Sequence, residues 1–149
     1  MLPPPYYKFI SNIIYWRCSF LIVKNPRDCS YSRVLDGTLL CELLHPKREG
    51  LKMNFSLAHA ILEPGESSLP HRLKKSVEVY YIIKGRAMMH VDDEKKSVGA
   101  GDAILIPAGC VQHIENIGDS ILSFLCIVSP PWRREDEELT PKRPKKEEI

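Results

Sequence analysis

Short apolar segments rich in β-branched and aromatic residues recur along the chain from Thr38 onward, and Gly, Pro and Asp separate them. No longer stretch keeps the period of an amphipathic helix between capping residues. Short strands with turn residues between them are typical of an all-β sandwich or barrel with little helix. The expected strands are 38–44, 53–62, 77–83, 87–91, 103–106, 111–115 and 121–128.

The beginning of the chain differs from this pattern. Residues 6–23 are rich in aromatic and β-branched residues, but charged side chains such as Lys8 and Arg17 interrupt them. A membrane span needs about 20 largely apolar residues, and a secretory signal needs a basic start that the Pro-rich first residues do not supply. Residues 1–20 are therefore expected to form an appendage or an extra strand in front of one domain at 21–132.

The end of the chain is almost free of apolar residues. Residues 133–149 include six basic and six acidic side chains among seventeen. Such a segment buries too little apolar surface to offset the entropy lost on ordering. We expect 133–149 to be a disordered charged tail.

Composition restricts the class of partner. The chain has 149 residues and 44% apolar residues, enough for one core, and its formal net charge is only +2. No strong field therefore points to nucleic acid or to an anionic membrane. The expected partners are a small-molecule ligand and a second copy of the chain.

The cysteines also carry information. There are five of them, an odd number, and none is arranged in a Cys-x-x-Cys pair. This pattern argues against a disulfide framework and against a structural zinc site. The sequence predicts reduced thiols and a cytoplasmic protein.

Two glycine-bounded segments carry polar residues at regular spacing. In the first, Gly65, His71, Glu78 and Gly85 match at every spacing the motif Gly, five residues, His, one, His, three or four, Glu, six, Gly, with Leu73 in place of the second histidine. The second motif runs Gly, five residues, Pro, one, Gly, two, His, three, Asn. It is matched, with Gln112 in the histidine position, by Gly101, Pro107, Gly109 and Asn116.

On these motifs residues 34–130 resemble the cupin superfamily, and in particular small uncharacterised cupins described as mannose-6-phosphate-isomerase-like. The resemblance implies a double-stranded β-helix, or jelly-roll barrel, with a pocket inside. The usual metal ligands of that family are three histidines and one glutamate. Carried over to this chain, the resemblance implies a divalent metal (Fe, Mn, Ni or Zn) held by His71 and Glu78 and assisted by Gln112.

Strand alternation gives an independent expectation for the same residues. It places His71 and Leu73 on one face, and Glu78 and Tyr80 on one face of the next strand. The side chains of His71 and Glu78 can therefore meet inside a barrel. Three interpretations remain open: a weak metal site, a metal-free polar pocket, and a structural hydrogen-bonded pair.

Other side chains are candidates of lower rank. Gln112 fits the motif better than His113, which should face the opposite side. Tyr80 shares the face of Glu78, so it either orients a ligand or packs in the core. His59 and His90 are expected to be core residues, with His59 in reserve for proton transfer.

The function expected from the sequence is that of a small-molecule-binding cupin. If it is an enzyme of sugar or sugar-phosphate isomerase type, Glu78 or His59 would move a proton. The alternative is a non-catalytic ligand-binding or sensory module with a metal-free pocket. Val79 and Tyr81 lie opposite Glu78 and are apolar, which predicts a homodimer formed through the outer sheet face.

Overall fold

The computed structural model describes residues 21–141, and the segment 1–20 that we expected to be an appendage lies outside the described residues. Within the described range the chain is nearly all β, with only three short helical turns. The strands are β1 Ser32–Arg33, β2 Leu39–Leu44, β3 Ser56–Leu62, β4 His71–Leu73, β5 Val77–Lys84, β6 Arg86–Val91, β7 Glu94–Gly99, β8 Ala103–Ile106, β9 Gln112–Asn116, β10 Leu122–Ser129 and β11 Glu137–Leu139. The helical turns are η1 Pro26–Asp28, α1 Pro46–Glu49 and η2 Arg134–Asp136.

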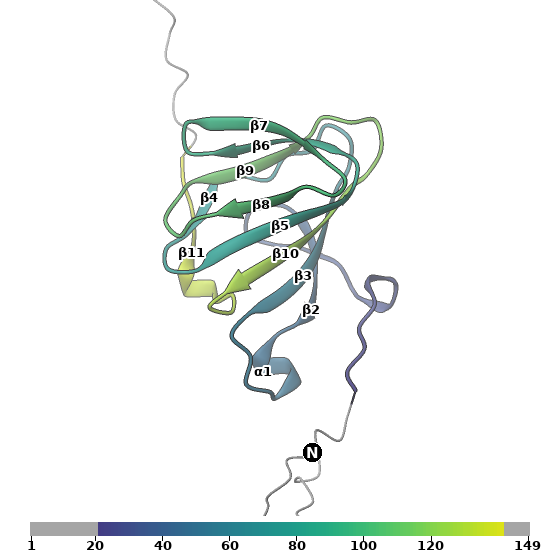
Figure 1. The fold of residues 1–149 in the computed structure, drawn as a ribbon, viewed down its shortest axis with the longest axis vertical. Coiled ribbons are helices and arrows are strands. Elements are labelled where there is room, and N and C mark those ends of the chain that lie inside the picture. The colour runs from purple at the N-terminus through teal and green to yellow at the C-terminus, as the bar shows by residue number, and fades with distance from the viewer. Residues whose placement is uncertain (1–20, 142–149) are drawn as a thin grey trace, which may run out of the picture.

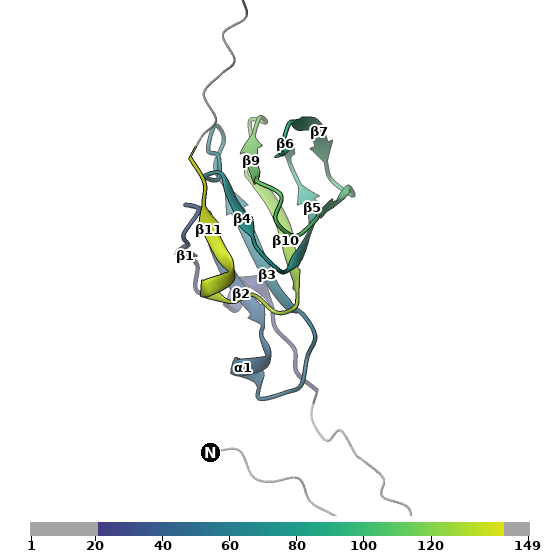
Figure 2. The same cartoon turned by 90° about the vertical axis from the view of Figure 1, so that its left-hand side faces the viewer.

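Two antiparallel sheets face each other (Figures 1 and 2). The first sheet has the order β1-β2-β3-β10-β5-β8, and the second has the order β11-β4-β9-β6-β7. In both sheets strands that are distant in the sequence are neighbours, as in a jelly roll. The expected fold class, an all-β cupin jelly roll with little helix, is confirmed.

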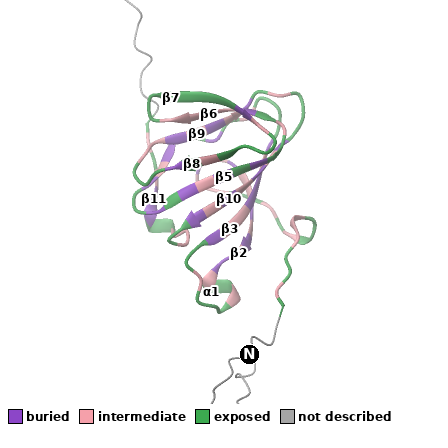
Figure 3. Cartoon of the chain, viewed as in Figure 1, coloured by how far each residue is buried: buried purple, intermediate pink, exposed green. Residues whose placement is uncertain are grey.

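The core lies between the inner faces of the two sheets. Along β5 and β10 buried residues alternate with more exposed ones, so that Ile82 and Phe124 are almost fully buried while Tyr81 is 42% exposed. Figure 3 shows the same alternation as bands along the strands. Burying one face of each strand supplies most of the apolar surface removed from water.

Two motif residues outside the pocket, Gly85 and Asn116, stabilise the turns between strands. Gly85 has φ 95°, and a Cβ at this position would lie 3.0 Å from the backbone oxygen of Ile121 and the Cα of Leu122. Only glycine fits this approach of two turns. The Nδ2 of Asn116 donates to the carbonyl oxygens of Leu62 and Ser120 at 2.9 and 2.8 Å, which fixes the connection between β9 and β10.

The elements differ from the prediction in two respects. The strands β1, β4 and β7 have no counterpart among the expected strands; β7 was missed because its residues are mostly polar and exposed and show no apolar alternation. Residues 133–141 are not part of a disordered tail: η2 and β11 lie there, and β11 pairs with β4, so that Glu137 is opposite Leu73. Residues 142–149 lie outside the described part of the chain.

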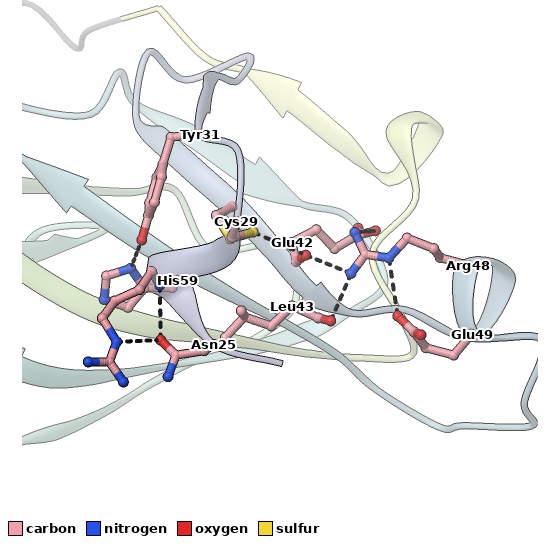
Figure 4. Close-up of a disulfide and its surroundings, with 10 residues drawn as sticks. Asn25, Cys29, Tyr31, Glu42, Leu43, Arg48, Glu49 and His59 are labelled. Carbon is pink, nitrogen blue, oxygen red and sulfur yellow. Dashed lines mark hydrogen bonds and ion pairs between the residues drawn. A yellow bond between two sulfur atoms is a disulfide. The ribbon is translucent and has the colours of Figure 1, made fainter. Parts of the chain in front are cut away.

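The expectation of reduced thiols was also wrong. Cys29, between η1 and β1, is bonded to Cys41 in β2, with a Cα–Cα separation of 6.0 Å that suits a disulfide (Figure 4). Cys110 and Cys126 are free. The pair was missed because its members stand twelve positions apart and come together through the antiparallel pairing of β1 with β2, which the sequence did not predict.

Among residues 21–141 no helix is long and apolar enough to cross a membrane.

Candidate functional site

A cavity of about 760 Å³ lies between the two sheets at the end where β1, β2 and β11 are found. Its wall includes His71, Leu73, Glu78 and Tyr80, which the sequence placed on inward faces. The segment before β1, from Val23 to Ser30, lines another part of the wall. The inner faces of both sheets and this segment therefore surround one pocket.

His71 is held by its own strand end. The side chain is in a residue only 3% exposed, and its Nδ1 lies 2.8 Å from the carbonyl oxygen of Leu69. A carbonyl oxygen can only accept, so Nδ1 carries a proton and donates, which leaves Nε2 as the ring nitrogen that can bind a metal. Leu73 lines the same cavity but has no donor atom.

Glu78 and Gln112 meet across the interior. Gln112 is 1% exposed and its Nε2 donates to the Glu78 carboxylate at 2.5 Å, while its Oε1 is buried without a hydrogen-bond partner. Burial raises the pKa of Glu78 to about 7, and the charge of His71 and the hydrogen bond from Gln112 oppose this rise. A carboxyl group with this pKa can take up or release a proton near neutral pH.

Two further carboxylates complete the site. Asp36 precedes β2, where its Oδ1 accepts from the backbone N–H of Thr38 at 3.0 Å and its Oδ2 lies 3.6 Å from His71 Nδ1. Glu137, in β11, accepts from the indole N–H of Trp132 at 3.0 Å. One potential ligand atom from each of Asp36, His71 and Glu137 lies within 4.8 Å of the other two, and all three residues are buried.

Trp132 explains how Glu137 reaches the cavity. The backbone N–H of Trp132 donates to the Ser56 hydroxyl, and its carbonyl oxygen accepts from His45 Nε2, both at 2.9 Å. These bonds tie the chain after β10 to the adjacent start of β3 and to the N-cap of α1. The next residues then return along β4 and carry the Glu137 carboxylate inside.

The site is rich in negative groups. Asp36, Glu78 and Glu137 are all less than a tenth exposed, and the nearby groups that offset their charge are His71 and, for Glu137, Arg134. Burial raises the pKa of Glu137; the charge of His71 and the hydrogen bond from Trp132 lower it, the charge of Asp36 raises it, and the charge of Arg134 lowers it. Buried carboxylates without matching positive charge are unfavourable unless protons or a cation neutralise them.

The structure brings His71, Glu78 and Gln112 together at one end of the barrel, but not His59. The His59 ring lies on the other face of β3, where its Nδ1 is 2.5 Å from the Tyr31 hydroxyl (Figure 4). Its Nε2 is 2.7 Å from the Ser123 hydroxyl. His59 does not line the cavity, so the reserve role in proton transfer was wrongly assigned. The outward direction of His113 was expected correctly: its ring stacks on that of His90.

Sequence reasoning missed Asp36 and Glu137. Asp36 stands in the Asp-Gly turn before the first long strand, and that turn was the signal available for it. Glu137 belongs to the charged segment that we expected to be disordered, and its composition gives no such signal.

Comparison with known proteins agrees with the fold. Residues 58–128 match the model of the cupin domain family. The chain is 45% identical over 105 residues to an uncharacterized protein of Methanocaldococcus jannaschii, covering 70% of this chain and 82% of that protein. It is 33% identical over 67 residues to an oxalate-binding protein of Thermotoga maritima, covering 45% of this chain and 55% of that one.

A solved structure of a nucleoside dehydratase from Streptomyces superposes with a TM-score of 0.65 at 16% identity, over 81% of this chain and 92% of that one. At this identity the likeness concerns the fold alone. Together with the matched family model and the two sequence motifs, it shows that the chain belongs to the cupin superfamily. The narrower resemblance to mannose-6-phosphate-isomerase-like cupins stays a prediction.

Proposed function

We propose that this cupin binds a small polar molecule through a divalent metal ion held by Asp36, His71 and Glu137. The observation that carries the proposal is the excess of buried carboxylate in the pocket, since one divalent ion would neutralise Asp36 and Glu137 together. Imidazole and carboxylate donors suit Fe, Mn, Ni and Zn.

The donors of this chain differ from the usual family set of three histidines and one glutamate, because Leu73 and Gln112 replace two histidines. Asp36 and Glu137 offer hard oxygen ligands instead. The Thr38 hydroxyl, which lines the cavity, is buried without a hydrogen-bond partner and is a further group for a ligand to contact. This supports an occupied pocket rather than a purely structural His71–Glu78 pair.

The sequence predicted that Glu78 and Gln112 are metal ligands. In this proposal they form instead a proton-transfer pair beside the ion. Gln112 holds the Glu78 carboxylate in place by donating Nε2, and Glu78 exchanges a proton with the bound molecule. The metal would polarise a carbonyl or hydroxyl group of that molecule. Tyr80 lines the same cavity and orients the bound molecule through its hydroxyl.

This arrangement suits isomerisation, in which a proton is removed from one carbon and returned to the next. A sugar or sugar phosphate is the substrate class that we propose. The second candidate is binding without turnover, which the similarity to an oxalate-binding protein favours. In that case the metal and Thr38 bind a small anion, and Glu78 has no catalytic role.

We further propose that the chain forms a homodimer. On the outer face of the first sheet β5, β8 and β10 expose adjacent apolar side chains, among which Tyr81 is 42% and Leu105 65% exposed. A second copy is the partner that we assign to this face. The cytoplasmic location stays a prediction, and the disulfide removes the cysteine argument that supported it.

Metal binding is tested by titrating metal-free protein with Mn²⁺ in a calorimeter. Glu137→Gln should lower the affinity of the pocket at least tenfold, because it removes an anionic ligand. Glu138→Gln is the matched control, since the neighbouring Glu138 pairs with Arg72 at the surface. Equal Mn²⁺ affinity in both variants would contradict the metal assignment.

Catalysis is tested separately with the metal-loaded protein. Proton NMR of incubations with aldose and ketose phosphates in D₂O should show deuterium entering the substrate, and Glu78→Gln should abolish it. Binding of these compounds without exchange would favour the non-catalytic alternative.

A further inference from the structure

A second cluster of potential ligands lies outside the pocket. His90 in β6 and His113 and Glu115 in β9 stand on the outer face of the second sheet, opposite to the inward Gln112 and Ile114. No part of the function proposed above uses these three residues. Their place on paired central strands fixes their backbones relative to one another.

The geometry of the cluster is close. His90 and His113 are directly opposite each other in the antiparallel pair, and their rings stack with centroids 4.0 Å apart and planes 11° from parallel. The same oxygen of Glu115, Oε1, lies 3.4 Å from His90 Nε2 and 3.6 Å from His113 Nε2. One ligand atom from each residue lies within 4.8 Å of the other two.

The stacked rings have to adjust before they share an ion. A metal ion lies in the plane of each imidazole that binds it, and two nearly parallel planes whose ring centroids are 4.0 Å apart do not meet at one such position. One ring therefore turns about its Cβ–Cγ bond on binding, and His90 can do so without losing a hydrogen bond at Nε2, because this atom has no hydrogen-bond partner in the structure. The Glu115 carboxylate supplies the anionic ligand, while Lys95, the partner of His90 on β7, places a positive charge nearby.

We propose that His90, His113 and Glu115 form a second metal site, which takes Zn²⁺ or a similar borderline divalent ion from solvent. Two imidazoles and one carboxylate are ligands that zinc prefers, and three protein ligands leave a position for water. The side chains are 23–43% exposed, so the ion approaches from the outer face of the sheet, and a turn of the His90 ring uncovers its buried Nε2. Because the site joins β6 to β9, bound Zn²⁺ stabilises the second sheet.

The proposal is tested with Zn²⁺ alone, by long-range ¹H–¹⁵N spectra of the histidine side chains. Adding Zn²⁺ should shift the ¹⁵N resonances of the His90 and His113 rings together. In the Glu137→Gln variant, whose pocket binds metal weakly, these shifts should be complete at one equivalent of Zn²⁺. The use of this variant separates binding at this site from binding in the pocket proposed above. No shift at these two rings with tenfold excess of Zn²⁺ would overturn the proposal.

Thermal unfolding gives a second readout. At a Zn²⁺ concentration about 100 times Kd, the melting temperature of Glu137→Gln should rise by about 5 to 10 °C. His113→Ala in the same background should lose the rise, whereas Lys95→Gln, which removes the neighbouring positive charge, should keep or enlarge it. An equal rise with and without His113 would also overturn the proposal.

Discussion

Asp136 is the residue that most directly ties the C-terminal segment to the fold. It is 2% exposed, and its carboxylate accepts from the backbone N–H groups of Lys75 at 2.9 Å and Ser76 at 3.0 Å. Burial alone would raise the pKa of Asp136, but these hydrogen bonds and the charge of Arg133 hold the pKa below its usual value. Both N–H groups belong to the turn that leads from the His71 strand into the Glu78 strand.

Asp136→Ala should therefore destabilise the protein and weaken the pocket. The buried N–H of Ser76 and the partly buried N–H of Lys75 lose their acceptor, and at roughly 1–3 kcal/mol for a buried group the free energy of unfolding should fall by about 3 kcal/mol. The measurement is urea unfolding at pH 7, followed by fluorescence. Mn²⁺ affinity should also fall, because Glu137 is the next residue and depends on the same segment.

Glu135→Ala is the control, since Glu135 lies in the same helical turn but is exposed. It should change the free energy of unfolding by less than about 0.5 kcal/mol. If Asp136→Ala were equally mild, residues 133–141 would not be integral to the fold, and the first expectation of a solvated tail would be the better description. In wild type the contribution of Asp136 should be present above pH 4 and be lost as the pH falls through its depressed pKa.

Three further outcomes follow from the structure. In metal-free protein the raised pKa of Glu78, about 7 against an ordinary 4.5, should make wild-type stability fall by about 3 kcal/mol as the pH rises from 4.5 to 8, at about 1.4 kcal/mol for each pH unit. Glu78→Gln should remove this fall when the free energy of unfolding is measured with urea at each pH. If the variant kept the same dependence on pH, the raised pKa would not belong to Glu78. Replacing Cys29 and Cys41 by Ser should lower the unfolding free energy by about 3 kcal/mol, as expected for a loop of this length, and a reductant should then have no additional effect. Light scattering should report a dimer for wild type and a monomer for Tyr81→Glu with Leu105→Glu, whereas a wild-type particle of 17.1 kDa would contradict the dimer.

The sequence was sufficient for those parts of the site that lie on regular strands. Because side chains alternate along a strand, the inward directions of His71, Leu73 and Glu78 could be predicted, and so could the opposite directions of Gln112 and His113. The glycines at the motif ends also marked turns correctly; Gly85 has the positive φ that its turn requires. Local periodicity and turn chemistry carry this information.

The rest depends on contacts between distant segments. Glu137 reaches the pocket because Trp132 is held by Ser56 and His45, and nothing in a run of charged residues predicts that anchoring. Asp36 reaches the pocket because its turn lies beside the segment that leads into β4. There the backbone N–H of Leu69 donates to the backbone carbonyl oxygen of Asp36 at 2.7 Å. Both contacts are tertiary, so the ligand set could not be completed from motif spacing.

Anomalous diffraction from a crystal grown with Mn²⁺ tests the central claim most directly. A peak between Asp36, His71 and Glu137, about 2.1 Å from a ligand atom of each, is the predicted result. A pocket peak bound instead by Glu78 and the amide oxygen of Gln112, or a pocket with no peak under conditions where Mn²⁺ binding saturates, would contradict it.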